Sequence, residues 1–133
     1  SVDNWAICDS FVSSLKEIRK HREDYYPLLC RYLESEEEFI QRYALVVLLN
    51  YYIDENYLND LYRILVSRNF HGCYSRMAAA WLLSFLFLYD FPKTVCFLQK
   101  ETVDPFVYKK GIQKALDSCR LNSEQKQLLK TLR

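Results

Sequence analysis

Apolar residues recur at helical spacing from the start of the chain. Spacings of three and four residues predict an apolar face on a helix over residues 3–20, with Asp3 or Asn4 as its N-cap. A second helix is expected over residues 24–33. Pro27 would lie in its first turn, where a missing backbone N–H costs little.

Two longer helices are apolar on all sides at their centres, which is typical of helices enclosed by their neighbours. We expect the first over residues 36–53 and the second over residues 73–89. Ser35 and Glu38 have the spacing of a capping box, which predicts the start of the first of these helices. The apolar run at 77–89 is too short to cross a bilayer and is interpreted as part of a buried helix.

Capping residues mark the remaining helices. One helix is expected to begin at Asp54 or Asn56 and to end before Asn69. Three further helix starts each carry a side-chain oxygen that can accept from the free N–H groups of the first turn, at Asp90, Asp104 and Asn122. Proline follows the first two of these caps within two residues, in agreement with the same boundaries.

The eight expected helices form four pairs, and the pairs repeat. Arg42, Arg76 and Lys110 are 34 residues apart, each in the first helix of its pair, and the same step back from Arg42 leads to Cys8, beside Asp9. A helix-pair repeat of this length is typical of α-solenoids. We therefore expect an all-α fold, an α-solenoid of antiparallel helix pairs with these positions along one surface.

Composition agrees with this fold class. Residues 1–133 suit a single domain, half of them are hydrophobic, and only two Gly and three Pro interrupt the helical pattern. The five cysteines show no CxxC pairing and no secretory signal accompanies them, so we expect reduced, buried thiols of a cytosolic protein. His21 and His71 have no companions at metal-ligand spacing, and no metal site is expected.

The net charge is +1, but the two parts of the chain differ. Residues 1–60 carry 6 basic and 12 acidic side chains, whereas residues 61–133 carry 12 and 5. A basic half is suited to facing phosphates. Helix surfaces are commonly charged in any case, so this asymmetry by itself leaves both interpretations open.

Several stretches resemble one protein family in their order and spacing. They are Asn4-Trp5-x-x-x-Asp9, Phe39-Ile40-x-Arg42-x-Ala44, Tyr74-x-Arg76-x-Ala78-x-Ala80-Trp81-x-Leu83 and the C-terminal run Tyr108–Ala115. Together they resemble the DNA alkylation repair proteins of the AlkD-like group, which are DNA glycosylases built from HEAT-like repeats. The resemblance covers essentially the whole chain and implies a HEAT-like α-solenoid.

The resemblance implies a monofunctional glycosylase that excises cationic alkylated purines, such as 3-alkyladenine and 7-alkylguanine, from duplex DNA. It maps the catalytic carboxylate onto Asp9 and two sugar-contacting tryptophans onto Trp5 and Trp81. The carboxylate would stabilise positive charge developing on the deoxyribose, and the indoles would add cation–π attraction. From the residues alone, Trp5 and Asp9 equally suit a packed tryptophan beside a solvated charge. By the same reasoning, the apolar run around Trp81 favours a core position.

Basic residues on the equivalent helices are expected to hold phosphates. These residues are Arg42, Arg76 and Lys110, with Tyr74 beside them and with Lys109 and Lys114 as weaker candidates. Alternatively, they are solvated or pair with the acidic run at 36–38. The resemblance implies no cofactor and no metal. The expected partner is alkylated double-stranded DNA, bound by a monomer in a bacterial-type cytoplasm at the nucleoid, with no membrane association.

Members of this family carry further helical repeats before the Trp-x-x-x-Asp motif, whereas here the motif stands at the start of the chain. We therefore expect the chain to be the C-terminal portion of a longer protein, with lower activity or none by itself. Two other functions stay open, namely a non-catalytic HEAT-like DNA-binding protein and a protein-interaction scaffold.

Overall fold

The computed structural model describes residues 18 and 20–133. Within them the chain forms seven α-helices and no strand, which confirms the all-α prediction. The helices are α2 (Arg22–Leu33), α3 (Glu38–Tyr51), α4 (Leu58–Ser67), α5 (Cys73–Tyr89), α6 (Phe91–Lys100), α7 (Pro105–Leu116) and α8 (Ser123–Leu132). The helix expected over 3–20 lies almost entirely outside the described residues.

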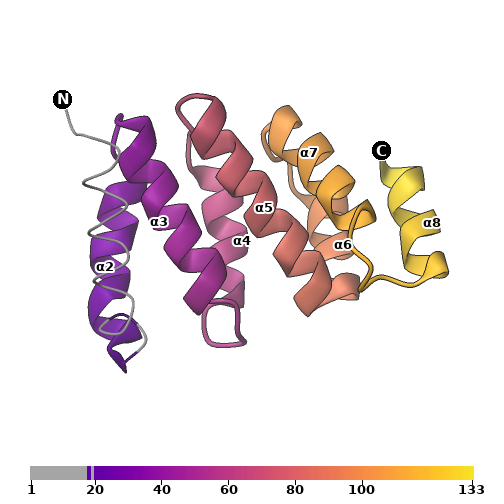
Figure 1. The fold of residues 1–133 in the computed structure, drawn as a ribbon, viewed down its shortest axis with the longest axis horizontal. Helices are drawn as coiled ribbons and strands as arrows, with labels where there is room; N and C mark the ends of the chain where they lie inside the picture. Colours follow the sequence, from indigo (N-terminus) through magenta and orange to yellow (C-terminus); the bar gives the residue numbers. More distant parts are fainter. Residues whose placement is uncertain (1–17, 19) are drawn as a thin grey trace.

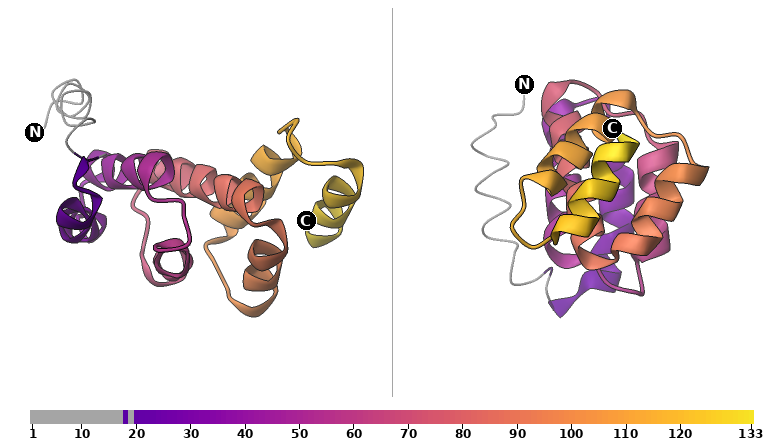
Figure 2. Two further views of the ribbon diagram at one scale, coloured as in Figure 1. Left: turned by 90° about the horizontal axis from the view of Figure 1, so that it is seen from below. Right: turned by 90° about the vertical axis from the view of Figure 1, so that its right-hand side faces the viewer.

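The helices form two rows (Figures 1 and 2). In the first row α3, α5 and α7 lie side by side, and α5 packs extensively against α7 and α3. Behind them lie α4 and α6, with α2 and α8 towards the two ends. Buried apolar side chains between the helices form one hydrophobic cluster. Arg42, Arg76 and Lys110 consequently lie on three successive helices of the first row.

Three expected helix caps are confirmed. Asp90, Asp104 and Asn122 each accept from a backbone N–H in the first turn of the following helix. Asn122 also forms a complete capping box with Gln125. Helix geometry leaves these N–H groups without partners, so a residue that satisfies them locally marks the boundary reliably.

The capping box expected at Ser35 is wrong. Ser35 Oγ accepts from the N–H of Glu37 at 3.0 Å, but α3 begins at Glu38 and its N-cap makes no side-chain hydrogen bond. The Glu38 carboxylate accepts instead from the backbone N–H of Tyr74, at 3.0 Å, in the first turn of α5. The Glu38 carboxylate, which the spacing from Ser35 predicted as part of the cap of α3, therefore satisfies a free backbone N–H of α5 instead.

Gly72 allows α5 to begin this close to α3. Its φ is +91°, in the left-handed region, and a Cβ at this position would collide with the Glu38 carboxylate. On the same side, Arg42 Nη1 donates to the carbonyl of Tyr74 at 3.3 Å. Glu38 and Arg42, in the first turns of α3, thus bind the backbone N–H and the carbonyl of Tyr74 at the start of α5.

Two expected boundaries are displaced. α2 begins at Arg22, before the expected start, so Pro27 lies inside the helix and not in its first turn. α4 begins at Leu58 without a side-chain cap, because Asp54 accepts from the N–H of Asn56 in the preceding turn and forms an ion pair with Arg22. The Asp54 carboxylate, predicted as a cap of α4, is thus paired with Arg22 at the start of α2.

A fully buried glutamine joins the loops that precede α3 and α5. Gln41 Nε2 donates to the carbonyls of Leu33 at 3.0 Å and Asn69 at 2.6 Å. Its Oε1 accepts from the backbone N–H of His71 at 2.8 Å. Both ends of the amide are therefore satisfied, as burial requires.

Further along the row, α5 and α7 approach each other closely at Gly111. A Cβ built on this residue would lie 2.6 Å from Leu83 Cδ2. Such a contact is shorter than van der Waals packing permits, so only glycine allows this helix spacing.

The expectation of buried cysteines is wrong for most of those described. Cys73, Cys96 and Cys119 are exposed and Cys30 is half-buried, and these four thiols are free. Cys73 follows the Gly72 turn and Cys119 lies in the connection after α7, where neighbouring helices do not cover them. Among the described residues, no helix is long and apolar enough to cross a membrane.

Candidate nucleic-acid interface

Trp81 lies at the surface of the longest helix of the first row. Its neighbours Ala80, Leu82 and Leu83 are fully buried, whereas 39% of Trp81 is exposed. The core position that its apolar run favours is therefore wrong, and so is the expectation that α5 is enclosed on all sides. The reason is the row itself, because α3 and α7 flank α5 and α6 packs against it, leaving one side open to solvent.

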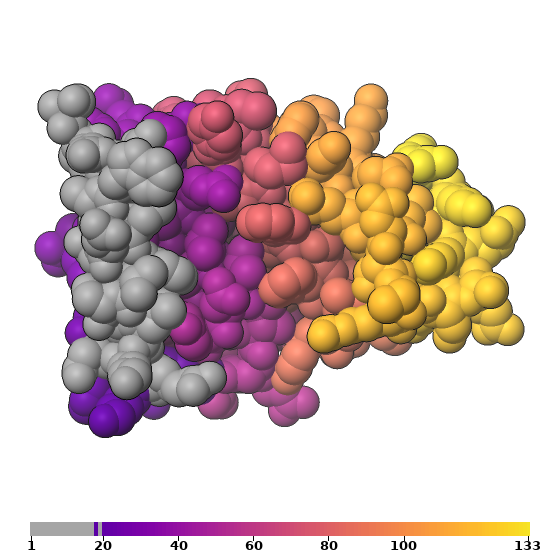
Figure 3. Space-filling view, in the orientation of Figure 1, coloured from indigo at the N-terminus to yellow at the C-terminus, as the bar shows by residue number. Residues whose placement is uncertain are grey.

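A cation from the next helix faces the indole. Lys114 Nζ, on α7, lies 4.9 Å from the centre of the Trp81 ring, within the range of a cation–π contact. Figure 3 shows the face on which α3, α5 and α7 succeed one another. A flat aromatic surface beside an ammonium group can contact a sugar or base together with its phosphate.

A second aromatic–cation pair lies nearer the start of α5. Tyr74 is 55% exposed, and the Arg42 guanidinium carbon lies 5.9 Å from the centre of its ring. The ring of Phe39 lies 5.5 Å from that of Tyr74. Since Tyr74 and Trp81 are seven residues apart, they lie on the same side of α5.

The repeated cations contact their neighbours in different ways. Arg42 reaches the Tyr74 carbonyl, and Arg76 Nε lies 3.6 Å from Asp104 Oδ2, so both extend to the start of the next helix in the row. Arg76 thus pairs with Asp104 and not with the acidic run at 36–38. The 34-residue spacing has a structural basis in these contacts between successive helices.

Lys110, the third repeated cation, lines a separate hollow of about 310 Å³ on α7. The other residues around it are Phe106, Lys109, Gln113 and Arg133. The Arg133 guanidinium donates to Gln113 Oε1 at 2.9 Å across this hollow. Lys110 and Lys114 are four residues apart, so they lie on the same side of α7, one turn from each other.

Trp5 and Asp9 lie outside the residues that the structure describes. The described part of the expected site therefore consists of Trp81 and Tyr74 on α5, with the basic side chains on α3, α5 and α7.

Sequence reasoning missed the continuation of the aromatic surface towards the end of α5. Phe85 and Tyr89 follow Trp81 at steps of four residues and are 38% and 44% exposed. With Arg120, from the connection between α7 and α8, they line a hollow of about 260 Å³, whose other lining residues are Leu49, Ile53 and Leu88. The sequence shows that these rings are four residues apart. Because the residues between them are mostly apolar as well, the sequence does not indicate which side of the helix is exposed.

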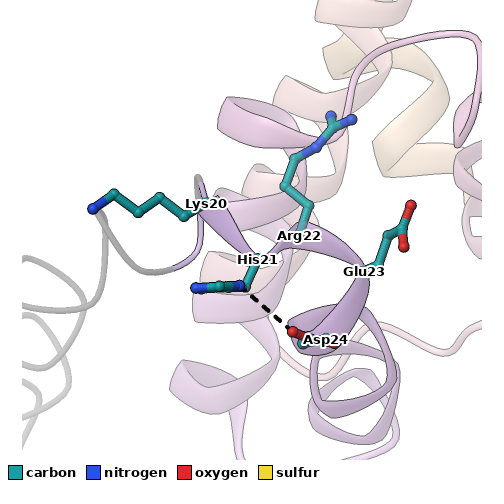
Figure 4. A pocket seen from close by; sticks show the side chains of 5 residues that line it. All are labelled: Lys20, His21, Arg22, Glu23 and Asp24. Carbon is teal, nitrogen blue, oxygen red and sulfur yellow. Dashed lines mark ion pairs between the residues drawn. The ribbon is translucent and has the colours of Figure 1, made fainter.

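A polar hollow at the start of α2 lacks these features. It measures about 260 Å³ and is lined by residues 20–24, with His21 Nδ1 3.6 Å from Asp24 Oδ2. Figure 4 shows that the five side chains spread in different directions and do not converge on one point. Within the part of the chain that the structure describes, no three potential metal ligands gather in one place.

The strongest pKa shifts belong to a tyrosine cluster between α2 and the end of α3. The rings of Tyr26, Tyr52 and Tyr57 pack with centres 4.9 to 5.7 Å apart. Burial raises the pKa of Tyr26, and it raises the pKa of Tyr52 to about 12. The Tyr52 hydroxyl donates to the carbonyl of Arg22 at 2.6 Å, so the cluster joins α2 to the end of α3. Its contacts assign it a structural role.

Comparison with known proteins gives no relative for this chain. No family model, no curated protein and no solved structure matches it. The resemblance to the AlkD-like group therefore rests on the quoted residues and their spacing.

Proposed function

We propose that the chain is a DNA glycosylase built from HEAT-like helix pairs, which excises purines made cationic by alkylation. The 34-residue spacing of Arg42, Arg76 and Lys110 supports a solenoid of three pairs, α3–α4, α5–α6 and α7–α8. In this solenoid α3, α5 and α7 form the row that faces DNA.

One observation carries the proposal, and it is the exposed indole of Trp81 facing the ammonium group of Lys114 at 4.9 Å. Tryptophan can bury more apolar area than almost any other residue, so leaving Trp81 partly open between buried neighbours forgoes stabilisation. Clustered exposed aromatic residues are typical of binding surfaces, and Phe85 and Tyr89 follow Trp81 at steps of four residues with similar exposure. Trp81 is also one of the two tryptophans to which the resemblance assigns contact with the lesion sugar.

The chemistry needs little from the protein beyond electrostatics. An alkylated purine carries a positive charge, so it leaves with the electrons of the N-glycosidic bond as a neutral base without prior protonation. Positive charge then develops on the deoxyribose, where the carboxylate of Asp9 stabilises it and orients the water that adds to C1′ and releases a proton. Trp81 flanks the sugar, and Lys114 holds an adjacent phosphate.

The test is release of methylated purines from alkylated duplex DNA by the chain and by Trp81→Leu. We expect the substitution to lower the release rate at least tenfold, which corresponds to about 1.4 kcal/mol of lost transition-state stabilisation. The matched control is Leu128→Ala, since 41% of Leu128 is exposed on α8, outside the row that faces DNA. Its rate should stay within about twofold, and equal losses in both variants would contradict the proposed role of Trp81.

A protein-interaction scaffold is the second candidate, and the contacts of Arg42 and Arg76 favour it. Both side chains link successive helices, so their repetition also serves the scaffold itself. DNA affinity separates the two candidates. A DNA-binding surface loses affinity steeply as salt rises, whereas a scaffold without a DNA role shows no appreciable DNA affinity even at low salt.

A further inference from the structure

We propose that the exposed aromatic side of α5 is a binding track for single-stranded nucleic acid, on which unpaired bases stack. The α5 stripe consists of Tyr74, Trp81, Phe85 and Tyr89. This inference extends beyond base excision in a duplex and depends only on the surface of α5 and its neighbours.

The α5 stripe is long and continuous. Its residues follow one another at steps of seven, four and four, which places all of them on one side of the helix. At the rise of an α-helix it extends over about 22 Å. All four side chains are at least 38% exposed. Four rings offer stacking surfaces to about four nucleotides, the lower end of the site sizes of single-strand-binding folds.

The cations along the stripe come from other elements. Arg42 of α3 lies over Tyr74, Lys114 of α7 lies over Trp81, and Arg120 lines the hollow with Phe85 and Tyr89. α5 itself carries no charged residue between Arg76 and Asp90. Exposed aromatic rings with cations on or beside them are the arrangement by which proteins hold the bases and the backbone of a single strand together.

The end of the stripe carries an open, shallow hollow of a size that suits one base. The hollow beside Phe85 and Tyr89 has a volume of about 260 Å³, and Leu49, Ile53 and Leu88 also line it. This volume lies just below the range of drug-sized ligand sites, roughly 300–1,000 Å³, and suits a group the size of a nucleobase. Arg120 at its edge is placed to pair with the phosphate of the same nucleotide.

Unpaired bases fit this surface better than a duplex or a peptide does. In a duplex the faces of the bases are stacked on one another, so a row of aromatic rings finds no base face to contact. An apolar peptide helix would be served by aliphatic side chains and gains nothing from a cation beside each ring. Rings flanked by cations favour a partner that is flat and anionic at once.

The experiment measures affinity of the chain for a labelled oligothymidine of about eight nucleotides at low and moderate salt. The test variant is Phe85→Leu combined with Tyr89→Leu, which keeps the surface apolar but removes the stacking rings. Alanine substitution costs about 1–3 kcal/mol per stacked base, so we expect at least a tenfold loss of affinity. Arg120→Gln should lower the magnitude of the salt slope by about 0.7, the value of one phosphate contact on a single strand.

The matched control is Phe106→Leu, which should leave the affinity within about twofold. Circular dichroism of every variant checks that the helical content is kept. The proposal is overturned if the unaltered chain does not bind the oligothymidine at low salt, or if the Phe85→Leu/Tyr89→Leu variant binds as well as the unaltered chain. Equal or tighter binding of a duplex of the same length, with the same dependence on Phe85 and Tyr89, also overturns it. Purine release is measured separately, so this inference and the proposed glycosylase fail independently.

Discussion

At the scale of the residue, Gln41 determines how the starts of α3 and α5 are held together. Its amide is the common partner of two carbonyls and one N–H from two loops that are distant in sequence. A buried polar group without a partner costs about 1–3 kcal/mol, whereas a satisfied one contributes only modestly. The value of Gln41 therefore lies in the three backbone groups that would otherwise be left unpaired.

We expect Gln41→Leu to lower the free energy of unfolding by about 3 kcal/mol. Leucine has a similar volume, but the carbonyls of Leu33 and Asn69 and the N–H of His71 lose their partner. Urea unfolding followed by circular dichroism measures the change. Asn50→Leu is the control on the same helix, because Asn50 is exposed and bonds only to its own helix at Val46. If Gln41→Leu lowered the free energy of unfolding by less than about 1 kcal/mol, the hydrogen bonds of Gln41 would not be what holds the two loops together.

At the scale of the element, successive helices of the first row are joined at their N-terminal ends. The Glu38 carboxylate and Arg42 hold Tyr74 at the start of α5, and Arg76 pairs with Asp104 at the start of α7. Asp104 does two things at once, since Oδ1 caps α7 while Oδ2 meets Arg76. Two of the three repeated cations, Arg42 and Arg76, thus reach the start of the next helix through different partners.

We expect Asp104→Ala to lower stability by about 1–2 kcal/mol, since it removes both the cap and the ion pair. Asp104→Asn keeps a capping oxygen and removes the charge, so it should cost less than about 1 kcal/mol. Thermal or urea unfolding of the two variants separates the contributions. If both variants lost the same amount of stability, the ion pair with Arg76 would contribute more than the capping hydrogen bonds, which would contradict this prediction.

The sequence predicts those elements whose boundaries are set by local contacts. Asp90, Asp104 and Asn122 cap helices within their own turns, and their spacing is sufficient to place the helix starts. Ser35 and Asp54 have similar local patterns, yet tertiary partners decide where α3 and α4 begin. Capping chemistry is readable from sequence only where no distant group competes for the same side chain.

The candidate site is predictable in part for the same reason. The residues that the resemblance identifies include Trp81 and Tyr74, both of which are exposed. Phe85, Tyr89 and Arg120 were not identified, because the exposed side of an apolar helix depends on which neighbours cover it. That information lies in the packing of α3, α6 and α7 around α5 and not in the sequence of α5.

At the scale of the whole molecule, the row of helices becomes polar at its α7 side. Steps of 34 residues relate Leu49 and Leu83, which are buried, to Asp117, which is exposed. The same step relates buried Leu45 and Ala79 to half-buried Gln113. A repeat whose outer side is polar resembles the capping repeats that solenoids require. This pattern supports the proposed repeat architecture without reference to any related protein.

The proposed glycosylase assigns its chemistry to the carboxylate of Asp9 and its contacts with duplex DNA to Trp81 and the basic side chains of the first row. In the proposed mechanism Asp9 stabilises charge only in the transition state, so its contribution to binding the substrate is small. Binding and chemistry should therefore separate when this carboxylate is neutralised.

The most direct measurement is purine release from alkylated duplex DNA by the chain and by Asp9→Asn, together with the affinity of both for the same DNA. We predict that Asp9→Asn binds DNA within about twofold of the unaltered chain while its release rate falls at least a hundredfold, about 2.7 kcal/mol in activation free energy. Release that persists in the variant, or binding and release that fall together, would contradict catalysis by Asp9. Absence of both purine release and salt-dependent DNA affinity in the unaltered chain would contradict the proposal that this chain is part of a glycosylase.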